Sequence, residues 1–330
     1  MKAFTNANAR SISDAVSLIA RARQENRSVA IAGGGSDLLG QMKERLVTPD
    51  LLVRLAAIKN LDTVKVTNPG VTIGGQMTLA ALAANALIRG EFAVLAQAAE
   101  GVATPQIRNV ATLAGNLCQR PWCWYYRNGF KCLKNGGTTC YSVTGENEFH
   151  AIFGGGPSYI VHPSDTAPAL VALDASFRIV GPSGERRVPA ADFFTLPTVN
   201  SARENVLADG EILAEIILPS RSRASIRSTY HKILDREAWT HAVVSAAVVM
   251  EMDKDKDVCR RARIVLGGVA PIPWRLPEVE AMLTGQRVTP ELAAKAGEAA
   301  VTGARPLAKN GYKVPMVRAM VARTLTGLVA

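Results

Sequence analysis

Apolar residues recur at helical and strand spacing from the start of the chain, and they predict a β–α–β unit there. Ser13 fits the N-cap of a helix over 14–23, because its hydroxyl can accept a free backbone N–H of the first turn. Short apolar runs over 29–32 and 51–55 predict buried strands, and a second helical pattern begins at Leu38. The apolar face of the first helix comprises Ala15, Val16, Ile19 and Ala22.

Two further stretches also alternate strand and helix patterns. The first of these two, which is the second region of the chain, is interrupted by a turn-rich segment over 118–150. The run 219–223 indicates where this region ends. The third has long apolar strands joined by a charged turn over 253–257, followed by helical patterns. Strands are expected over 71–75, 177–180, 212–218, 243–252 and 262–269. Helices are expected from 78 to 100 and over 166–173, 276–284, 289–304 and 314–328.

Composition supports a globular protein of more than one domain. The 330 residues favour two or three domains, and 48% hydrophobic with 20% charged residues is typical of a folded chain. No apolar run approaches the roughly 20 residues of a membrane helix. The N-terminus lacks an apolar signal core, so we expect cytoplasmic residence, or a periplasmic location through export together with a signal-bearing partner.

The formal charge of +10 does not indicate nucleic-acid binding. The basic residues are scattered, and the densest groups, at 21–23 and 260–263, have no interleaved aromatic side chains for base stacking. An acidic partner or an anionic cofactor would account for the charge equally well.

A glycine-rich turn after the strand at 29–32 is the first candidate site. Gly33, Gly34 and Gly35 let backbone N–H groups converge on an anion, the following helix adds its positive end, and Ser36 adds a hydroxyl donor. Asp37 would repel a phosphate, so we interpret it as a helix cap turned away from the ligand. The run is neither Gly-x-Gly-x-x-Gly nor a P-loop, and it can also be an ordinary turn.

A second candidate loop spans 107–116. Small residues allow close backbone approach, and Thr112 and Asn116 offer side-chain hydrogen bonds. The alternative is a tight turn in which Thr112 caps a helix. Asp165 stands where a strand-like segment meets a helix, and its alternative role is also that of an N-cap. The small residues of the loop are Ala111, Ala114 and Gly115.

Cysteines are concentrated in the segment 118–150. Cys118, Cys123, Cys132 and Cys140 have the spacing Cys-x4-Cys-x8-Cys-x7-Cys, while Cys259 lies far away in a strand pattern and is expected to be a buried structural thiol. Thiolates ligate iron–sulfur clusters and zinc. Zinc sites usually have paired Cys-x2-Cys units, and disulfides need an oxidising compartment. The spacing favours a cluster, and zinc and disulfides remain as alternatives.

Taken in order, these segments resemble the FAD-binding subunit of the molybdenum hydroxylases, the family of xanthine dehydrogenase and carbon monoxide dehydrogenase. The cysteine segment is absent from most such subunits, and it resembles the insertion that carries a [4Fe–4S] cluster in the aldehyde oxidoreductase branch. The matching segments are 32–38, 107–116, 162–170, 210–213 and 265–270, together with Lys232.

The resemblance implies an α+β fold in three parts. A two-part FAD-binding domain of the vanillyl-alcohol-oxidase type would comprise 1–57 and 58–222, with the iron–sulfur insertion at about 118–150. A C-terminal sheet-plus-helices domain of the CO dehydrogenase flavoprotein type would comprise 223–330.

The resemblance also implies residue roles. FAD would be held between the two glycine-containing loops, with Asp165 bonded to the flavin–ribityl half and Lys232 near the isoalloxazine. The cluster ligands would be the four cysteines of the insertion. The implied FAD-binding residues are Ala32, Gly33, Gly34, Gly35, Ser36, Asp37, Leu38, Ala111, Thr112, Ala114, Gly115, Asn116, Asp165, Leu213 and Lys232.

By the same resemblance, the chain is an electron-transfer subunit without a substrate-oxidising centre of its own. A large molybdenum-cofactor partner would oxidise an aldehyde or N-heterocycle, and a small partner with two [2Fe–2S] clusters would pass the electrons to the FAD. The alternatives are a stand-alone flavin oxidase of the vanillyl-alcohol type and a non-enzymatic interaction module stabilised by a metal.

Overall fold

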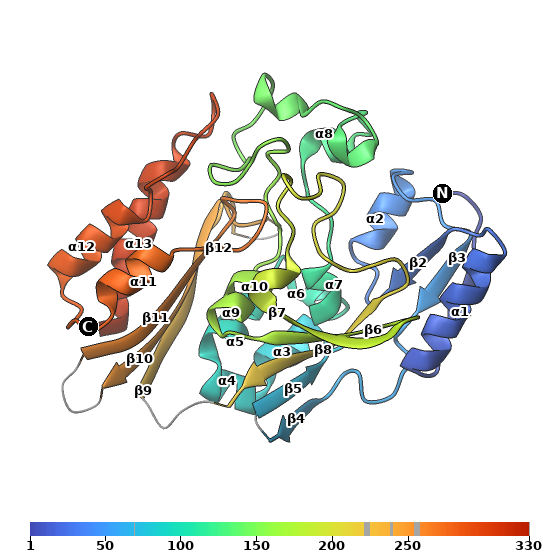
Figure 1. Ribbon diagram of the computed structural model, residues 1–330, viewed down its shortest axis with the longest axis horizontal. Coiled ribbons are helices and arrows are strands. Elements are labelled where there is room, and N and C mark those ends of the chain that lie inside the picture. Colours follow the sequence, from blue (N-terminus) through green and yellow to red (C-terminus); the bar gives the residue numbers. More distant parts are fainter. Residues whose placement is uncertain (69, 221–224, 238–239, 254–257, 330) are drawn as a thin grey trace.

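The computed structural model describes residues 1–68, 70–220, 225–237, 240–253 and 258–329. These residues form three β-sheets with helices between and outside them, which confirms the α+β class (Figure 1). The boundary expected after residue 222, and most of the charged turn over 253–257, lie outside the described residues.

The first sheet is parallel and forms one end of the molecule, with strand order β1–β3–β2. Helix α1 (Ile12–Gln24) packs its apolar side on this sheet, as expected. Its N-cap is Ser11, whose hydroxyl accepts from the Asp14 N–H at 3.0 Å, so the Ser13 prediction is wrong by two positions. Ser11 has the extended backbone of an N-cap, whereas Ser13 already lies in the first turn. The strands are β1 (Thr5–Asn8), β2 (Val29–Ala32) and β3 (Leu51–Arg54).

The second sheet is antiparallel, with order β4–β5–β8–β6–β7, so β8 returns from far along the chain to lie between β5 and β6. Its strands are β4 (Val64–Thr67), β5 (Gly70–Gly74), β6 (Ser176–Gly181), β7 (Gly184–Pro189) and β8 (Ile212–Pro219). Its helices are α3 (Leu79–Ala84), α4 (Ala86–Glu91), α5 (Ala93–Glu100), α6 (Pro105–Arg108), α7 (Leu113–Leu117), α9 (Thr166–Ala172) and α10 (Ala190–Phe193).

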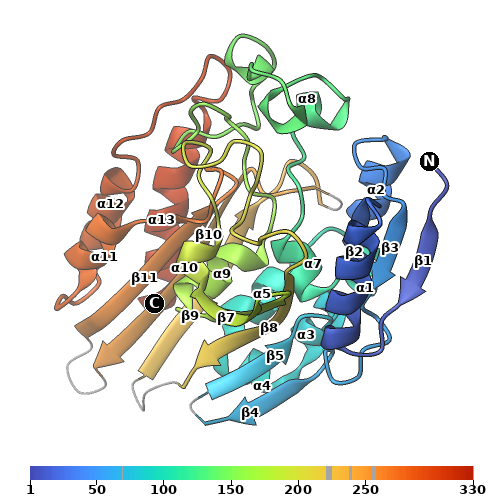
Figure 2. The ribbon, with the colours of Figure 1, turned by 45° about the vertical axis from the view of Figure 1, so that its right-hand side comes forward.

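The third sheet is antiparallel with order β12–β11–β10–β9. Three helices cover its outer face, and α5 and α9 pack against its inner face (Figures 1 and 2). Strand β10 is buried on both sides, which explains its nearly unbroken apolar sequence. The strands are β9 (Ser225–Ile233), β10 (Val244–Asp253), β11 (Val258–Gly267) and β12 (Trp274–Arg275). The helices are α11 (Pro277–Leu283), α12 (Pro290–Ala299) and α13 (Lys313–Val329).

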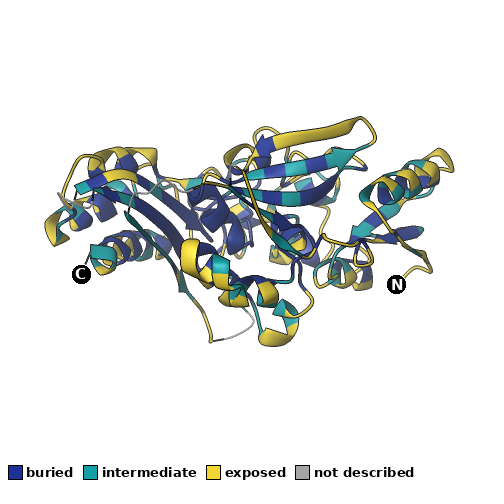
Figure 3. Cartoon of the chain, turned by 90° about the horizontal axis from the view of Figure 1, so that it is seen from below, coloured by how far each residue is buried: buried dark blue, intermediate teal, exposed yellow. Residues whose placement is uncertain are grey.

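Helix α9 packs between the third sheet and the helices α5, α7 and α10. Each of its residues is buried, in keeping with its uniformly small and apolar sequence, and it contacts β10, β11 and α5. Figure 3 shows the same pattern across the molecule, with buried strands inside and exposed residues on the outer sides of helices and in loops. No helix in the described part of the chain has the length and apolarity needed to cross a bilayer.

The cysteine segment forms a cap at one edge of the molecule, beyond α2 (Leu38–Lys43) and the loop that precedes α13 (Figure 1). It contains α8 (Trp124–Arg127) and two 3-10 helices, η1 (Leu133–Asn135) and η2 (Tyr141–Val143). Short helices and turns without a sheet are consistent with the loop-like composition of the sequence.

Candidate functional site

The two glycine-containing loops, which are far apart in the sequence, meet in the structure. A Cβ on Gly34 would overlap the backbone carbonyl of Val110, and a Cβ on Gly33 would lie 2.5 Å from Thr112 Oγ1. Gly35 has a φ of +77°, a conformation that L side chains rarely adopt. The approach of the loops therefore depends on the absence of side chains at these positions.

The glycine turn carries unused hydrogen-bond donors. Within the described residues, the backbone N–H groups of Gly33, Gly34, Gly35 and Ser36 have no acceptor. Gly33 and Gly35 are half-buried, whereas Gly34 and Ser36 are exposed, and successive free N–H groups in one turn can form an anion-binding concavity. The turn is thus suited to receive a phosphate group.

Asp37 does not cap α2, contrary to our interpretation. It occupies the N-cap position but makes no side-chain cap bond, and its backbone is helical rather than extended. Its carboxylate accepts from Arg127 Nη2 at 2.7 Å and from the Arg120 N–H at 2.9 Å. The acid is turned toward the cysteine segment because two basic residues of that segment approach it, and Leu38 behind it begins α2.

In the second loop, the side chains predicted to bind a ligand also hold the loop together. Thr112 caps α7, accepting from the Gly115 N–H at 3.2 Å, as its alternative role predicted. Asn116 Oδ1 accepts from Ser164 Oγ at 2.5 Å and from Thr166 Oγ1 at 2.7 Å. The loop is thereby fastened to the start of α9, which brings it next to Asp165.

The remaining small residues of this loop are buried beneath it. Ala111 and Ala114 are both buried, as are Ala32 and Leu213. The Leu213 carbonyl and the Ala114 Cβ flank Gly75 so closely that a Cβ there would lie 2.7 Å and 3.0 Å from them. Strand β8 and the loop are therefore in close contact, and Leu213 contributes through its backbone.

Asp165 and Lys232, which were predicted separately, form a buried ion pair. Lys232 Nζ lies 2.7 Å from Asp165 Oδ2, and the two side chains are 6% and 4% exposed. Tyr230 donates to Asp165 Oδ1 at 2.6 Å, and Lys232 also donates to the Gly101 carbonyl at 2.9 Å. The carboxylate is thus used between domains rather than as a side-chain cap of α9.

Tyr230 was missed by the sequence reasoning. Burial, followed by the charge of Asp165, raises the pKa of its phenol well above the usual value, so it remains a hydrogen-bond donor. Residues two apart on a strand share a face, so recognising the chain around Lys232 as a strand would also have pointed to Tyr230.

Three of the four clustered cysteines surround one cavity. Cys123, Cys132 and Cys140 line it, together with Tyr125, Tyr126 and other residues, and Cys118 is not part of this lining. Cys118 instead follows α7, where burial raises the pKa of its thiol to about 12. The structure therefore brings three predicted ligands together and leaves the fourth apart. In the described part of the chain, no three His, Cys, Asp or Glu side chains are placed to hold a single metal ion.

The thiols of the cavity have polar and aromatic neighbours. Burial raises the pKa of Cys123, against the opposing effect of backbone hydrogen bonds from Tyr126 and Tyr125. His150 Nε2 lies 3.4 Å from Cys123 Sγ, and burial, reinforced by the charge of Lys313, lowers the pKa of this histidine to about 4. From the sequence, His150 was expected to be a capping or surface residue, whereas the structure buries it. Cys259 is fully buried in β11, as expected, and burial raises the pKa of its thiol to about 11.

The cysteine segment is fixed by polar contacts to the other parts of the chain. Glu204 makes ion pairs with Arg120 at 2.8 Å and Lys134 at 2.6 Å, and the Lys134 and Glu204 side chains are nearly inaccessible. On the other side, Asn310 donates to the His150 carbonyl at 3.0 Å and Lys313 donates to the Phe149 carbonyl at 2.9 Å. The segment therefore bridges the regions around the second and third sheets.

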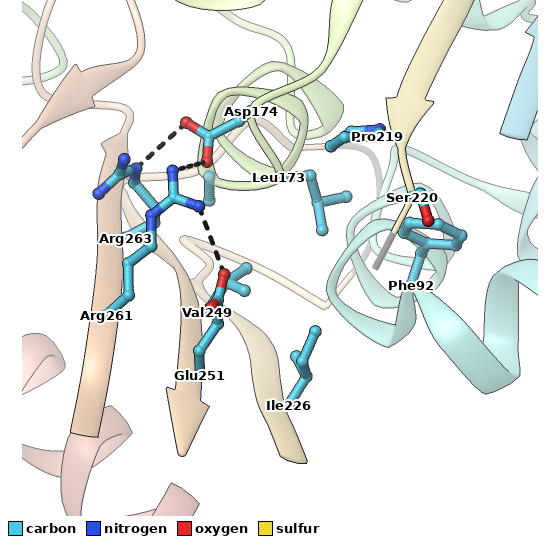
Figure 4. Close-up of a pocket in the computed structure, with 11 residues that line it drawn as sticks. Phe92, Leu173, Asp174, Pro219, Ser220, Ile226, Val249, Glu251, Arg261 and Arg263 are labelled. Atoms are coloured by element: carbon cyan, nitrogen blue, oxygen red, sulfur yellow. Dashed lines mark hydrogen bonds and ion pairs between the residues drawn. The ribbon is translucent and has the colours of Figure 1, made fainter. Parts of the chain in front are cut away.

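A separate cavity of about 200 Å³ lies at the far end of α9 from Asp165. There Asp174 is paired with Arg261 at 2.7 Å and Arg263 at 3.1 Å, while Phe92 and Ile226 supply apolar walls (Figure 4). Its charges are paired with one another, and none of the residues predicted to bind a cofactor lines it.

The fold and the paired loops define a class of protein that comparison with known families identifies. Residues 2–221 match the FAD binding domain in molybdopterin dehydrogenase, and residues 229–328 match the CO dehydrogenase flavoprotein C-terminal domain. The chain belongs to this family, the FAD-binding medium subunits of the molybdenum hydroxylases, and the resemblance and fold class inferred from the sequence are confirmed.

Among individual relatives, the chain is 33% identical over 337 residues to the aldehyde oxidoreductase FAD-binding subunit PaoB of Escherichia coli (strain K12), covering 100% of this chain and 98% of that protein. It is 27% identical to the carbon monoxide dehydrogenase medium chain of Hydrogenophaga pseudoflava, and the match covers 96% of this chain and 93% of that protein. A solved structure of carbon monoxide dehydrogenase from that organism superimposes with a TM-score of 0.76 at 25% identity. The superposition covers 98% of this chain and 96% of that one. The relatives are subunits of oxidoreductases.

Proposed function

We propose that the chain binds FAD at the junction of the two loops and transfers electrons within a molybdenum hydroxylase complex. The observation that carries the proposal is the set of acceptor-free N–H groups at Gly33–Ser36, held against the loop of Thr112 and Asn116. These donors would hold the pyrophosphate of the dinucleotide. FAD supplies the exchange between single-electron and paired-electron transfer.

The Asp165–Lys232 pair would orient the flavin half of the cofactor. A lone cation near the isoalloxazine would stabilise negative charge on the ring. Here Asp165 lies 2.7 Å from Lys232, so the pair presents little net charge. We therefore assign Lys232 chiefly to holding Asp165 in place, with Tyr230 as the second donor to that carboxylate.

Glycine substitutions test the FAD site with a matched control. Gly35 and Gly303 both have left-handed backbones, at φ +77° and +79°, and neither lacks room for a methyl group. Alanine at either position costs about 1–2 kcal/mol of backbone strain. We expect only Gly35→Ala to weaken FAD binding, by at least about tenfold, as measured by flavin absorbance after purification and by titration with FAD. Stoichiometric flavin in both variants would refute the assignment.

We further propose that Cys118, Cys123, Cys132 and Cys140 ligate a [4Fe–4S] cluster. Three of these thiols already line one cavity, but at about 10 Å³ it is too small for a cluster, so cluster assembly would have to move the thiols apart. Ligation by all four requires Cys118 to turn toward the cavity. Nearby, the rings of Tyr125 and Tyr141 are stacked, and Phe130 packs edge-to-face against both. These rings would shield the cluster from water.

Iron and acid-labile sulfide analysis tests the cluster. About four irons per chain are expected, and Cys132→Ala should lower that number while Cys259→Ala leaves it unchanged. Zinc in place of iron would contradict the proposal. The expected partners are a large molybdenum-cofactor subunit and a small subunit with two [2Fe–2S] clusters. Co-purification with molybdenum and additional iron supports them, and a lone flavoprotein that oxidises a substrate would contradict them.

A further inference from the structure

Gln76 is a buried polar residue shortly after β5 that the proposed FAD site does not yet use. The residue is 8% exposed, and its side chain forms no hydrogen bond in the described part of the chain. The amide end still reaches accessible space, because neither of its atoms is among the fully enclosed polar atoms that lack a partner. A buried amide, with two N–H donors and a carbonyl acceptor, normally has partners. The partner of Gln76 is therefore to be sought outside the described chain.

The amide lies against the glycine turn. A Cβ added to Gly33 would be 3.3 Å from Gln76 Nε2 and 3.5 Å from Gln76 Oε1. Thr112 Oγ1 approaches the same point, at 2.5 Å. The unpartnered amide is thus next to the turn whose backbone N–H groups have no acceptor, and all of these donors are available to one ligand.

The second loop holds the backbone on both sides of Gln76. The carbonyl of Gly75 accepts from the Ala114 N–H at 3.0 Å, and the carbonyl of Met77 accepts from the Leu113 N–H at 2.8 Å. The position of the side chain is consequently set by the same loop that meets the glycine turn. Gln76 therefore belongs to the junction of the two loops.

We propose that Gln76 is an FAD-binding residue, whose amide N–H donates a hydrogen bond to the pyrophosphate at the glycine turn. The inference rests on the proposed FAD-binding function and adds a side-chain contact to it. Phosphate oxygens only accept hydrogen bonds, so the amide and the backbone N–H groups suit them together. A neutral amide can also remain unpaired before the cofactor binds at a lower desolvation cost than a buried cation.

Three variants of the purified full chain test this inference. Gln76→Met keeps the length of the side chain without the donor, and Gln76→Glu places a carboxylate at the same position. The control is Gln41→Met, because Gln41 is also buried but its amide is bonded to Asp37 at 2.8 Å and to Tyr126 at 3.2 Å. The measurements are titration of the flavin-free protein with FAD and urea unfolding of the flavin-free protein.

We expect Gln76→Met to weaken FAD binding about tenfold. Gln76→Glu should weaken it further, because a carboxylate repels the pyrophosphate. Without FAD, Gln76→Met should be at least as stable as the unsubstituted chain, since no bond within the protein is lost. Gln41→Met should lose stability without FAD, because its two partners lose their bonds.

The outcomes that contradict the inference are distinct. Unchanged FAD affinity in Gln76→Met overturns it, while FAD uptake by the unsubstituted chain keeps the proposed function. Equal affinities of Gln76→Met and Gln76→Glu overturn the contact with phosphate, and Gln76→Met decides alone if Gln76→Glu does not fold. A loss of flavin-free stability in Gln76→Met as large as in Gln41→Met overturns it in favour of a structural role. Absence of FAD uptake by the unsubstituted chain overturns the proposed function, and the inference with it.

Discussion

Helix α9 has an aspartate at each end, and both meet basic side chains of the third sheet in different surroundings. At its start, Asp165 and Lys232 are 4% and 6% exposed, and Tyr230 adds a second donor. Past its other end, Asp174 and Arg261 are 40% and 46% exposed beside an open cavity. An exposed pair is screened by water, whereas a buried pair has a high desolvation cost that only complete pairing offsets. The first end is therefore sensitive to any missing partner, and the second is not.

The largest effect is expected for Asp165→Asn. The substitution leaves the ammonium of Lys232 buried without its carboxylate, which costs about 3–5 kcal/mol. Urea unfolding of the purified chain measures this loss, and flavin content measures release of FAD. The double variant Asp165→Asn/Lys232→Met should be more stable than Asp165→Asn alone, because it removes the uncompensated charge. If the loss of unfolding free energy in the double variant equalled the sum of the losses in the two single variants, Asp165 and Lys232 would not be coupled.

Tyr230→Phe should have an intermediate effect. It removes one hydrogen bond to a buried carboxylate while Lys232 keeps the charge paired, so a loss of about 1.5–3 kcal/mol is expected. The matched control is Tyr159→Phe, because no hydrogen bond of the Tyr159 hydroxyl is part of this network. Equal losses of unfolding free energy in the two variants would show that the hydrogen bond to Asp165 does not contribute to stability.

Lys313 extends the comparison to a buried cation whose partners are carbonyls rather than a carboxylate. Burial lowers the pKa of Lys313 to about 7. Between about pH 7 and pH 10 the unfolded chain binds this proton and the folded chain does not, so stability should rise with pH across that window. Lys313→Met should flatten the rise, as followed by urea unfolding at several pH values. A rise of the same slope in both proteins would exclude Lys313 as its source.

The smallest effect is expected for Asp174→Asn. The exposed pairs with Arg261 and Arg263 should contribute at most about 1 kcal/mol, and less at high salt. Unfolding in low and high salt, beside Asp165→Asn, measures the contrast directly. A loss as large as that of Asp165→Asn would invalidate the distinction between the two ends.

The parts of the fold that were predictable have repeated local signals. The buried strand β10 and the helix α13 follow from long apolar patterns. The turn at Gly33–Gly35 follows from three consecutive glycines, which are typical of turns. Strand β9 was not predicted, because most of its residues are only half-buried and its sequence alternates weakly.

The site was predictable as a set of residues but not as a set of contacts. Asp37 was expected to cap α2, yet its carboxylate pairs with Arg127, which lies 90 positions further along the chain. Likewise, Asp165 and Lys232 were each singled out, but their pairing depends on how the third sheet packs on α9. Long-range contacts of this kind leave no local pattern in a single sequence.

The attachment of the cysteine segment to Asn310 and Lys313 has a consequence for synthesis of the protein. These residues follow Cys140 by 170 positions or more (310 − 140 = 170), so the contacts that close the segment cannot form until that much more of the chain has been made. At typical elongation rates the thiols wait on the order of 10 s after they are made. During that interval they remain open both to cofactor loading and to oxidation, and the final helix ends it.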